Sequence, residues 1–144
     1  MADAIAEQIL DALTTTVTGL TTTGSNVQRA RVYPFAESVN SALTIFMGSD
    51  EVLQVQANDY IDWELTVVFM AHARATGNPD QTLNQIRKEV HAAVMADHTQ
   101  GGLVIDTNPV VVEEPELSSG DKPIASMRVE FSFQYRTTRT AIDA

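Results

Sequence analysis

The stretch from Tyr60 to Ala73 constrains the fold most, because its side chains alternate between apolar and polar over fourteen residues. Such alternation is typical of a β-strand with one face against the core. At about 3.3 Å per residue the strand would span about 46 Å, whereas a compact domain of this length is roughly 37 Å across. The strand must therefore bend, fray or project. Its apolar face is expected to contain Ile61, Trp63, Leu65, Val67, Phe69 and Ala71.

Two apolar residues, Val68 and Met70, fall on the otherwise polar face near the end of this strand. One interpretation is that a partner protein covers them, because exposed apolar patches mark interaction sites. The other is that a helix of the same chain covers them, since apolar residues usually lie in the core. The residues favour the second interpretation only slightly.

The residues before this strand predict one helix and several shorter strands. Ala2 to Val17 carries apolar residues at three- and four-residue steps, as in an amphipathic helix. This helix is expected to fray into a threonine-rich loop from Thr14 to Thr23. Ala42 to Met47 is almost continuously apolar, as expected of a central strand covered on both faces, and Gly48 to Asp50 should end it. Shorter strands are expected at Val27 to Tyr33, ahead of Pro34, and at Glu51 to Gln56.

The residues after the long strand predict a second helix and then a hairpin. Asn78 is a typical N-cap, Pro79 suits the first helical position, and Gln81 is placed for a capping box. Gly101 and Gly102 should stop the helix. Strands are expected at Leu103 to Asp106, Val110 to Glu113 and Ile124 to Tyr135, with a polar loop from Glu114 to Pro123. We predict a single α+β domain over residues 1–144, with a mixed, mainly antiparallel sheet of about four to six strands and two main helices.

Composition excludes several classes of function. Nine Lys and Arg residues stand against 19 Asp and Glu residues, which gives a formal charge of −10 and opposes binding to DNA phosphates. The chain has no cysteine, so disulfides, thiolate zinc sites and cysteine nucleophiles are excluded. No apolar run approaches the ~20 residues of a membrane span, and the acidic start differs from an export signal. A soluble acidic protein is expected.

The polar residues predict no catalytic or metal-binding constellation. His91 and His98 would lie two turns apart on one helix, about 10 Å in rise, which is too far to share an ion. The glycine pair follows a helix instead of opening one, so it does not predict a phosphate-binding loop. Asp62 and Glu64 share a strand face, which more often reflects a solvated edge than an acid–base pair. We therefore predict a protein that is not an enzyme and has no metal, nucleotide or other cofactor.

Two sets of charged residues are candidate interaction surfaces. Arginines near the first and last strands either meet acidic groups of a neighbouring subunit or pair with carboxylates of their own subunit. The acidic loop near residue 115 either faces a partner or is a solvated hairpin tip. The candidates are Arg29, Arg31, Arg136 and Arg139 in the cationic set, Glu113, Glu114, Glu116 and Asp121 in the acidic loop, and the apolar Val68 and Met70.

Five short stretches, in their order along the chain, carry a family resemblance. Each is a turn or a strand ending of a kind found in many proteins, so the resemblance depends on their joint order over essentially the whole chain. The chain resembles the tail terminator, or tail completion, proteins of long-tailed phages, of the minor tail protein U type. The stretches are Arg29 to Pro34, Ala42 to Phe46, Gly48 to Glu51, Ala96 to Leu103 and Phe133 to Thr137.

The resemblance implies a structural role in the virion. Six copies would close a ring on the major tail tube protein, end tail polymerisation and offer a surface to the head-completion or neck protein. The implied location is the tail-neck junction of the virion, reached from the host cytoplasm during assembly. DNA would pass the lumen without specific binding, since acidic walls repel phosphate, and no membrane partner is implied. The alternatives are another head-tail joining or neck ring protein and, less favoured, a small ligand-binding α+β domain.

Overall fold

The structure is a computed structural model of the chain and describes residues 3–30, 39–74, 77–117 and 123–144. The second half of the strand predicted at Val27 to Tyr33, and the candidates Arg31 and Asp121, lie outside these residues. The described elements are α1 (Ile5–Val17), β1 (Val27–Arg29), β2 (Ser41–Val55), β3 (Tyr60–Arg74), α2 (Pro79–Met95), β4 (Asp106–Val112), β5 (Glu116–Leu117) and β6 (Ile124–Thr138).

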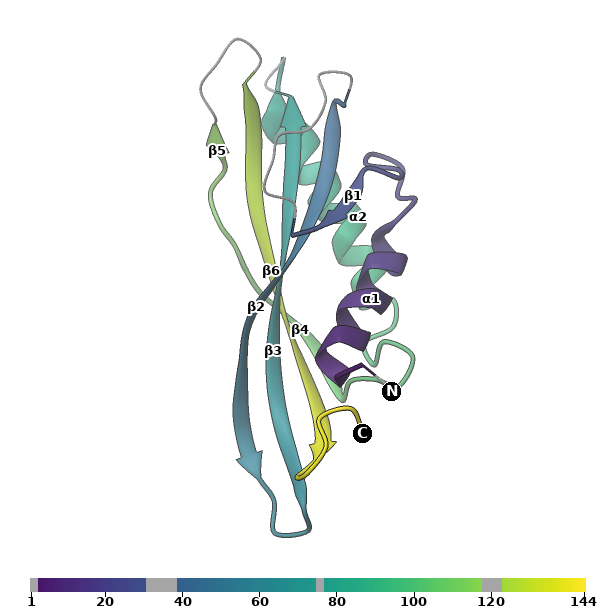
Figure 1. The fold of residues 1–144 in the computed structure, drawn as a ribbon. Coiled ribbons are helices and arrows are strands. Elements are labelled where there is room, and N and C mark those ends of the chain that lie inside the picture. Colours follow the sequence, from purple (N-terminus) through teal and green to yellow (C-terminus); the bar gives the residue numbers. More distant parts are fainter. Residues whose placement is uncertain (1–2, 31–38, 75–76, 118–122) are drawn as a thin grey trace.

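The described strands form one sheet in the order β1-β2-β3-β6-β4, and β5 also pairs with β6. The β1–β2 pair is parallel and the other pairs are antiparallel. Figure 1 shows α1 and α2 on the same side of a long, twisted sheet, with β2, β3 and β6 running through most of its length. The predicted α+β fold, with a mixed and mainly antiparallel sheet and two main helices, is therefore confirmed.

The hydrophobic core lies between the helices and one face of the sheet. Ile45, Phe69 and Val129 are register partners on three adjacent strands of this face. Phe69 also meets Phe131 edge-on, with ring centroids 5.7 Å apart, an arrangement that aromatic pairs favour. The helices contribute the buried stripes Ile9, Leu10, Leu13 and Val17 from α1 and Leu83, Ile86, Val90 and Val94 from α2.

The predicted long strand is β3, and its length is accommodated by neighbours that are equally long. β2, β3 and β6 each contain fifteen residues, so the sheet extends well beyond the helices (Figure 1). Val68 is only 3% exposed although it lies on the face opposite the helices, flanked by its register partners Phe46 and Glu130. Neither described helix, α1 or α2, lies on that face, so among the described elements Val68 is flanked by strands and not covered by a helix.

The prediction that a strand ends at Gly48 to Asp50 and a separate one follows at Glu51 to Gln56 is wrong, because β2 is continuous. Two register shifts in its pairing with β3 mark bulges, one between Met47 and Asp50 and one between Val52 and Gln54. Gly48 lies in the first bulge, where a Cβ atom would approach the Thr66 carbonyl oxygen to 2.8 Å. A glycine is required there by this close approach.

β2 was predicted to be covered on both faces, and this is true only of its first half. Ala42 to Ile45 are buried, as predicted for a central strand, whereas Met47 is 53% exposed. The change follows from the topology, because β1 pairs only with Leu43 to Ile45. Within the described residues, the second half of β2 is consequently an edge strand.

Two further corrections concern the last third of the chain. Leu103 lies in a turn, and β4 starts at Asp106 and continues through Pro109, where its register with β6 shifts. Proline is tolerated there because β4 is an edge strand. Glu116 and Leu117, predicted within a loop, pair with β6 as the short strand β5.

The helix ends follow the predictions in part. α1 continues through Val17, with the Thr14 hydroxyl donating to the Leu10 carbonyl oxygen at 2.8 Å, so its threonines are helical instead of frayed. α2 begins at Pro79 as predicted, but the Asn78 side chain makes no capping hydrogen bond. Gly101 and Gly102 adopt φ angles of 70° and 91° in the turns after α2, a conformation that favours glycine.

Candidate interaction surfaces

The second half of β2 and the start of β3 form a hairpin that extends past the helices (Figure 1), and we call residues 47–64 the projecting hairpin. It carries an unusual share of exposed apolar side chains. Their exposed fractions are between 39% and 53%. Exposed apolar groups gathered on one element are typical of interaction sites. They are Met47, Val52, Leu53, Val55 and Tyr60.

The base of the projecting hairpin is held by an aromatic and hydrogen-bonded cluster. Trp63 stacks on Tyr135 with ring centroids 6.3 Å apart, and its indole nitrogen donates to the Thr137 hydroxyl at 2.9 Å. The Tyr135 hydroxyl donates to the Asp50 carboxylate. Burial raises the pKa of Asp50, and burial together with the Asp50 carboxylate raises the pKa of Tyr135. These contacts fix the hairpin to β6.

Two carboxylates of the projecting hairpin lie directly opposite each other. Glu51 of β2 and Glu64 of β3 are register partners on the face away from the helices, and neither forms an ion pair with a described residue. Like charges at opposed positions of an antiparallel pair destabilise it. A cation placed beside this pair would offset that repulsion.

A groove lies between α2 and the edge strand β4. Its lining on β4 and β6 is mostly apolar but includes the Glu130 carboxylate, and Val110 and Val111 are 55% and 42% exposed. Arg87 and His91 of α2 line it too, and Lys88 lies beside them on the exposed surface of the helix. The positive charge of the groove is therefore confined to its α2 side.

Two of the three described arginines that were predicted as interaction sites pair within their own subunit. Arg29 Nη1 lies 2.5 Å from Glu7 Oε1 and 3.1 Å from Asp11 Oδ1, and this pairing lowers the pKa of Glu7. Arg136 Nε lies 2.7 Å from Asp62 Oδ1, which lowers the pKa of Asp62. For these two arginines the structure agrees with pairing inside the subunit.

The remaining candidates lie apart from one another. Arg139 is exposed, and its backbone N–H donates to the Asp59 carbonyl oxygen at 2.8 Å. The acidic set is exposed around β5, with Glu113 Oε2 3.4 Å from Arg128 Nε. Met70 is partly exposed on the same face as Val68. The described acidic residues of this set are Glu113, Glu114 and Glu116. The structure therefore does not gather the predicted candidates into one site.

Sequence reasoning missed the opposed Glu51 and Glu64 and the groove beside Arg87. The glutamate pair had a detectable signal, since both residues are almost equally distant from the turn around Asn58. That signal predicts the pairing of Glu51 with Glu64 only if β2 is already known to be one continuous strand. The groove had no comparable signal, because it depends on how α2 and β4 lie on β6.

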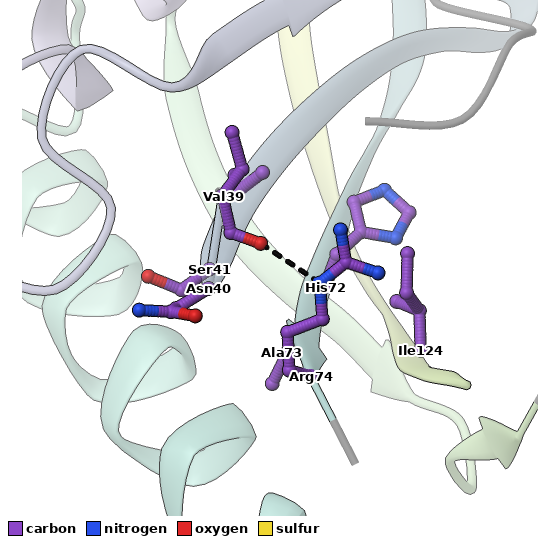
Figure 2. A pocket seen from close by; sticks show the side chains of 8 residues that line it. Val39, Asn40, Ser41, His72, Ala73, Arg74 and Ile124 are labelled. Atoms are coloured by element: carbon purple, nitrogen blue, oxygen red, sulfur yellow. Dashed lines mark hydrogen bonds between the residues drawn. The ribbon is translucent and has the colours of Figure 1, made fainter. Parts of the chain in front are cut away.

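A small pocket at the other end of the sheet surrounds His72 (Figure 2). The two imidazole nitrogens lie 3.0 Å from the Thr44 hydroxyl and 2.8 Å from the Ser126 hydroxyl, and burial lowers the pKa of His72 to about 4. In the same pocket Arg74 Nε donates to the Val39 carbonyl oxygen at 3.0 Å (Figure 2). A neutral imidazole with both nitrogens engaged bridges three strands and is not free to act as a base.

The described residues contain no group of three His, Asp or Glu side chains arranged to hold a metal ion. Among the same residues no helix has both the length and the apolar character to cross a membrane. His91 and His98 are both exposed, and His98 Nδ1 lies 3.4 Å from Asp106 Oδ1.

Comparison with known proteins gives a distant likeness. No protein-family model and no curated protein matches the chain. A chain of the virion of a native gene transfer agent particle is similar to it in structure, with a TM-score of 0.38 and 15% sequence identity over 93% of this chain and 92% of that chain. At this level of similarity no property of that particle transfers to this protein.

Proposed function

We propose that this protein is a structural virion component that caps the phage tail tube as a homohexameric ring, ends tail polymerisation and presents a surface to the head-completion or neck protein. The order of the five stretches resembling tail terminators supports this proposal. The observation that carries it is that the projecting hairpin and the α2–β4 groove are two separate, chemically different candidate surfaces. A closed cyclic ring requires two such surfaces on every copy.

The charge of the chain suits a ring around passing DNA. Six copies at −10 each give a formal charge of −60. An acidic wall repels phosphate, so DNA would slide through without specific binding. No catalytic role is proposed, because His72 is engaged at both ring nitrogens.

Electron microscopy of the purified protein, alone and mixed with tail tubes, tests this proposal. We expect six-fold rings and density for one ring at the tube end that faces the head. Addition of the protein to polymerising tube subunits should also stop elongation. A protein that stays monomeric by mass photometry and leaves tube length unchanged contradicts the proposal. Rings seated on the head side of the neck, with no effect on tube length, indicate a head-tail joining protein instead.

A further inference from the structure

The projecting hairpin and the α2–β4 groove are complementary in charge and in apolar character. On the hairpin, the opposed Glu51 and Glu64 share a face with Tyr60, which is 39% exposed, and Val52 lies on the other face. Beside the groove, Arg87 and Lys88 accompany the exposed valines of β4. Opposite charge at docking surfaces guides association and fixes its register.

Several cations of the described part of this acidic chain are already engaged. Arg29, Arg128 and Arg136 form ion pairs within the subunit, and Arg74 donates to the Val39 carbonyl oxygen. Arg87 and Lys88 form none with a described carboxylate and are exposed on α2. They are thus available to a carboxylate of another molecule.

We propose that the projecting hairpin of one copy docks into the α2–β4 groove of a second copy, with Glu51 and Glu64 facing Arg87 and Lys88. The proposal rests on the ring of the proposed function, since every copy then contributes its hairpin forward and its groove backward. Such a head-to-tail contact closes into a ring when the rotation between copies fits.

The contact is made by side chains and not by continuation of the sheet. Bulges interrupt the free edge of β2 at two places, and Pro109 and the adjacent register shift interrupt β4. Bulges and proline are the usual devices that prevent regular pairing of edge strands. The exposed apolar groups and the four charges are therefore what the two surfaces offer.

Charge reversal tests this contact. The hairpin variant carries Glu51→Lys and Glu64→Lys, and the groove variant carries Arg87→Glu and Lys88→Glu. Each variant should self-associate at least about tenfold more weakly than the wild type in sedimentation velocity, as expected for the loss of close charge pairs. A matched control, Asp3→Lys with Asp143→Lys, makes the same charge change as the hairpin variant at positions near the two termini, outside both surfaces, and should associate as the wild type does.

Mixing gives the decisive measurement. An equimolar mixture of the hairpin and groove variants should assemble again if the two variants alternate around the ring. Each reversed hairpin then meets a reversed groove, and each native hairpin meets a native groove. A ring with an even number of subunits allows this alternation. Thermal unfolding of each variant checks that it folds. Wild-type rings that persist in both variants overturn this inference and leave the proposed function standing. A monomeric wild type whose tube binding is lost in the hairpin variant also overturns it, and identifies the tube protein as the occupant.

Discussion

The buried position of His72 predicts a specific dependence of stability on pH. The pKa of His72 is lowered from 6.5 to about 4 because burial disfavours the charged imidazolium. Between these two values the unfolded chain binds a proton that the folded chain does not. Stability from this residue is therefore complete above pH 6.5, falls as the pH falls below 6.5, and stops changing below about pH 4.

The size of the effect follows from the two pKa values. One pKa unit corresponds to about 1.4 kcal/mol, so a drop from 6.5 to about 4 amounts to about 3 kcal/mol over the whole window. This is a large fraction of the stability of an ordinary domain. His72→Gln removes the titration while keeping groups that can hydrogen-bond to the Thr44 and Ser126 hydroxyls.

Urea unfolding at pH 7.5, 6, 5 and 4.5 measures this dependence. The difference in unfolding free energy between wild type and His72→Gln isolates His72, because carboxylates that titrate at lower pH contribute equally to both proteins. His91→Gln is the matched control, since His91 is exposed on α2, and it should keep the wild-type slope. Parallel pH profiles for wild type and His72→Gln would refute the assignment of a buried neutral imidazole.

Three further substitutions test other features. Gly48→Ala should lower the unfolding free energy by about 1–3 kcal/mol, as overpacking does, since the added Cβ meets a backbone carbonyl; denaturant unfolding measures this, and an unchanged midpoint contradicts it. Tyr135→Phe should cost about 1–3 kcal/mol by leaving its carboxylate partner without this donor, with a smaller loss once pH is low enough to protonate that carboxylate. Combined replacement of Glu113, Glu114 and Glu116 by Ser should change stability by less than about 1 kcal/mol, because these side chains are exposed, yet reduce attachment to tail tubes; normal tails in a completion assay would remove the acidic loop from the proposed function.

The long strand was predictable because most of it alternates and its pairing is unbroken. Every residue of β3 pairs in register with β6, so period-two alternation in sequence maps directly onto the two faces. The buried stripes of α1 and α2 were predictable in the same way, because their apolar residues recur at the three- and four-residue spacing of a regular helix. Regular elements that bury one face therefore reveal themselves in sequence.

The second half of β2 was not predictable because bulges reset the alternation. Val52 and Val55 appear out of phase in sequence, yet their register partners Trp63 and Ile61 lie on the same face of β3. Leu53 is the additional residue that shifts the phase. The candidate surfaces depend on this shift, so the facing of Glu51 toward Glu64 could not be derived from periodicity.

The pairing of β3 with β6 also has a consequence for the order of folding. The β2–β3 hairpin closes a short local loop, whereas β3 and β6 join residues as distant in the chain as Tyr60 and Thr138. Closing long loops is entropically slow, so local contacts form first. A folding chain would therefore pass through a state in which the β2–β3 hairpin is formed but the edge of β3 that pairs with β6 is still unpaired. During that interval the unpaired edge is open to capture by a second chain, and refolding yield should fall as protein concentration rises.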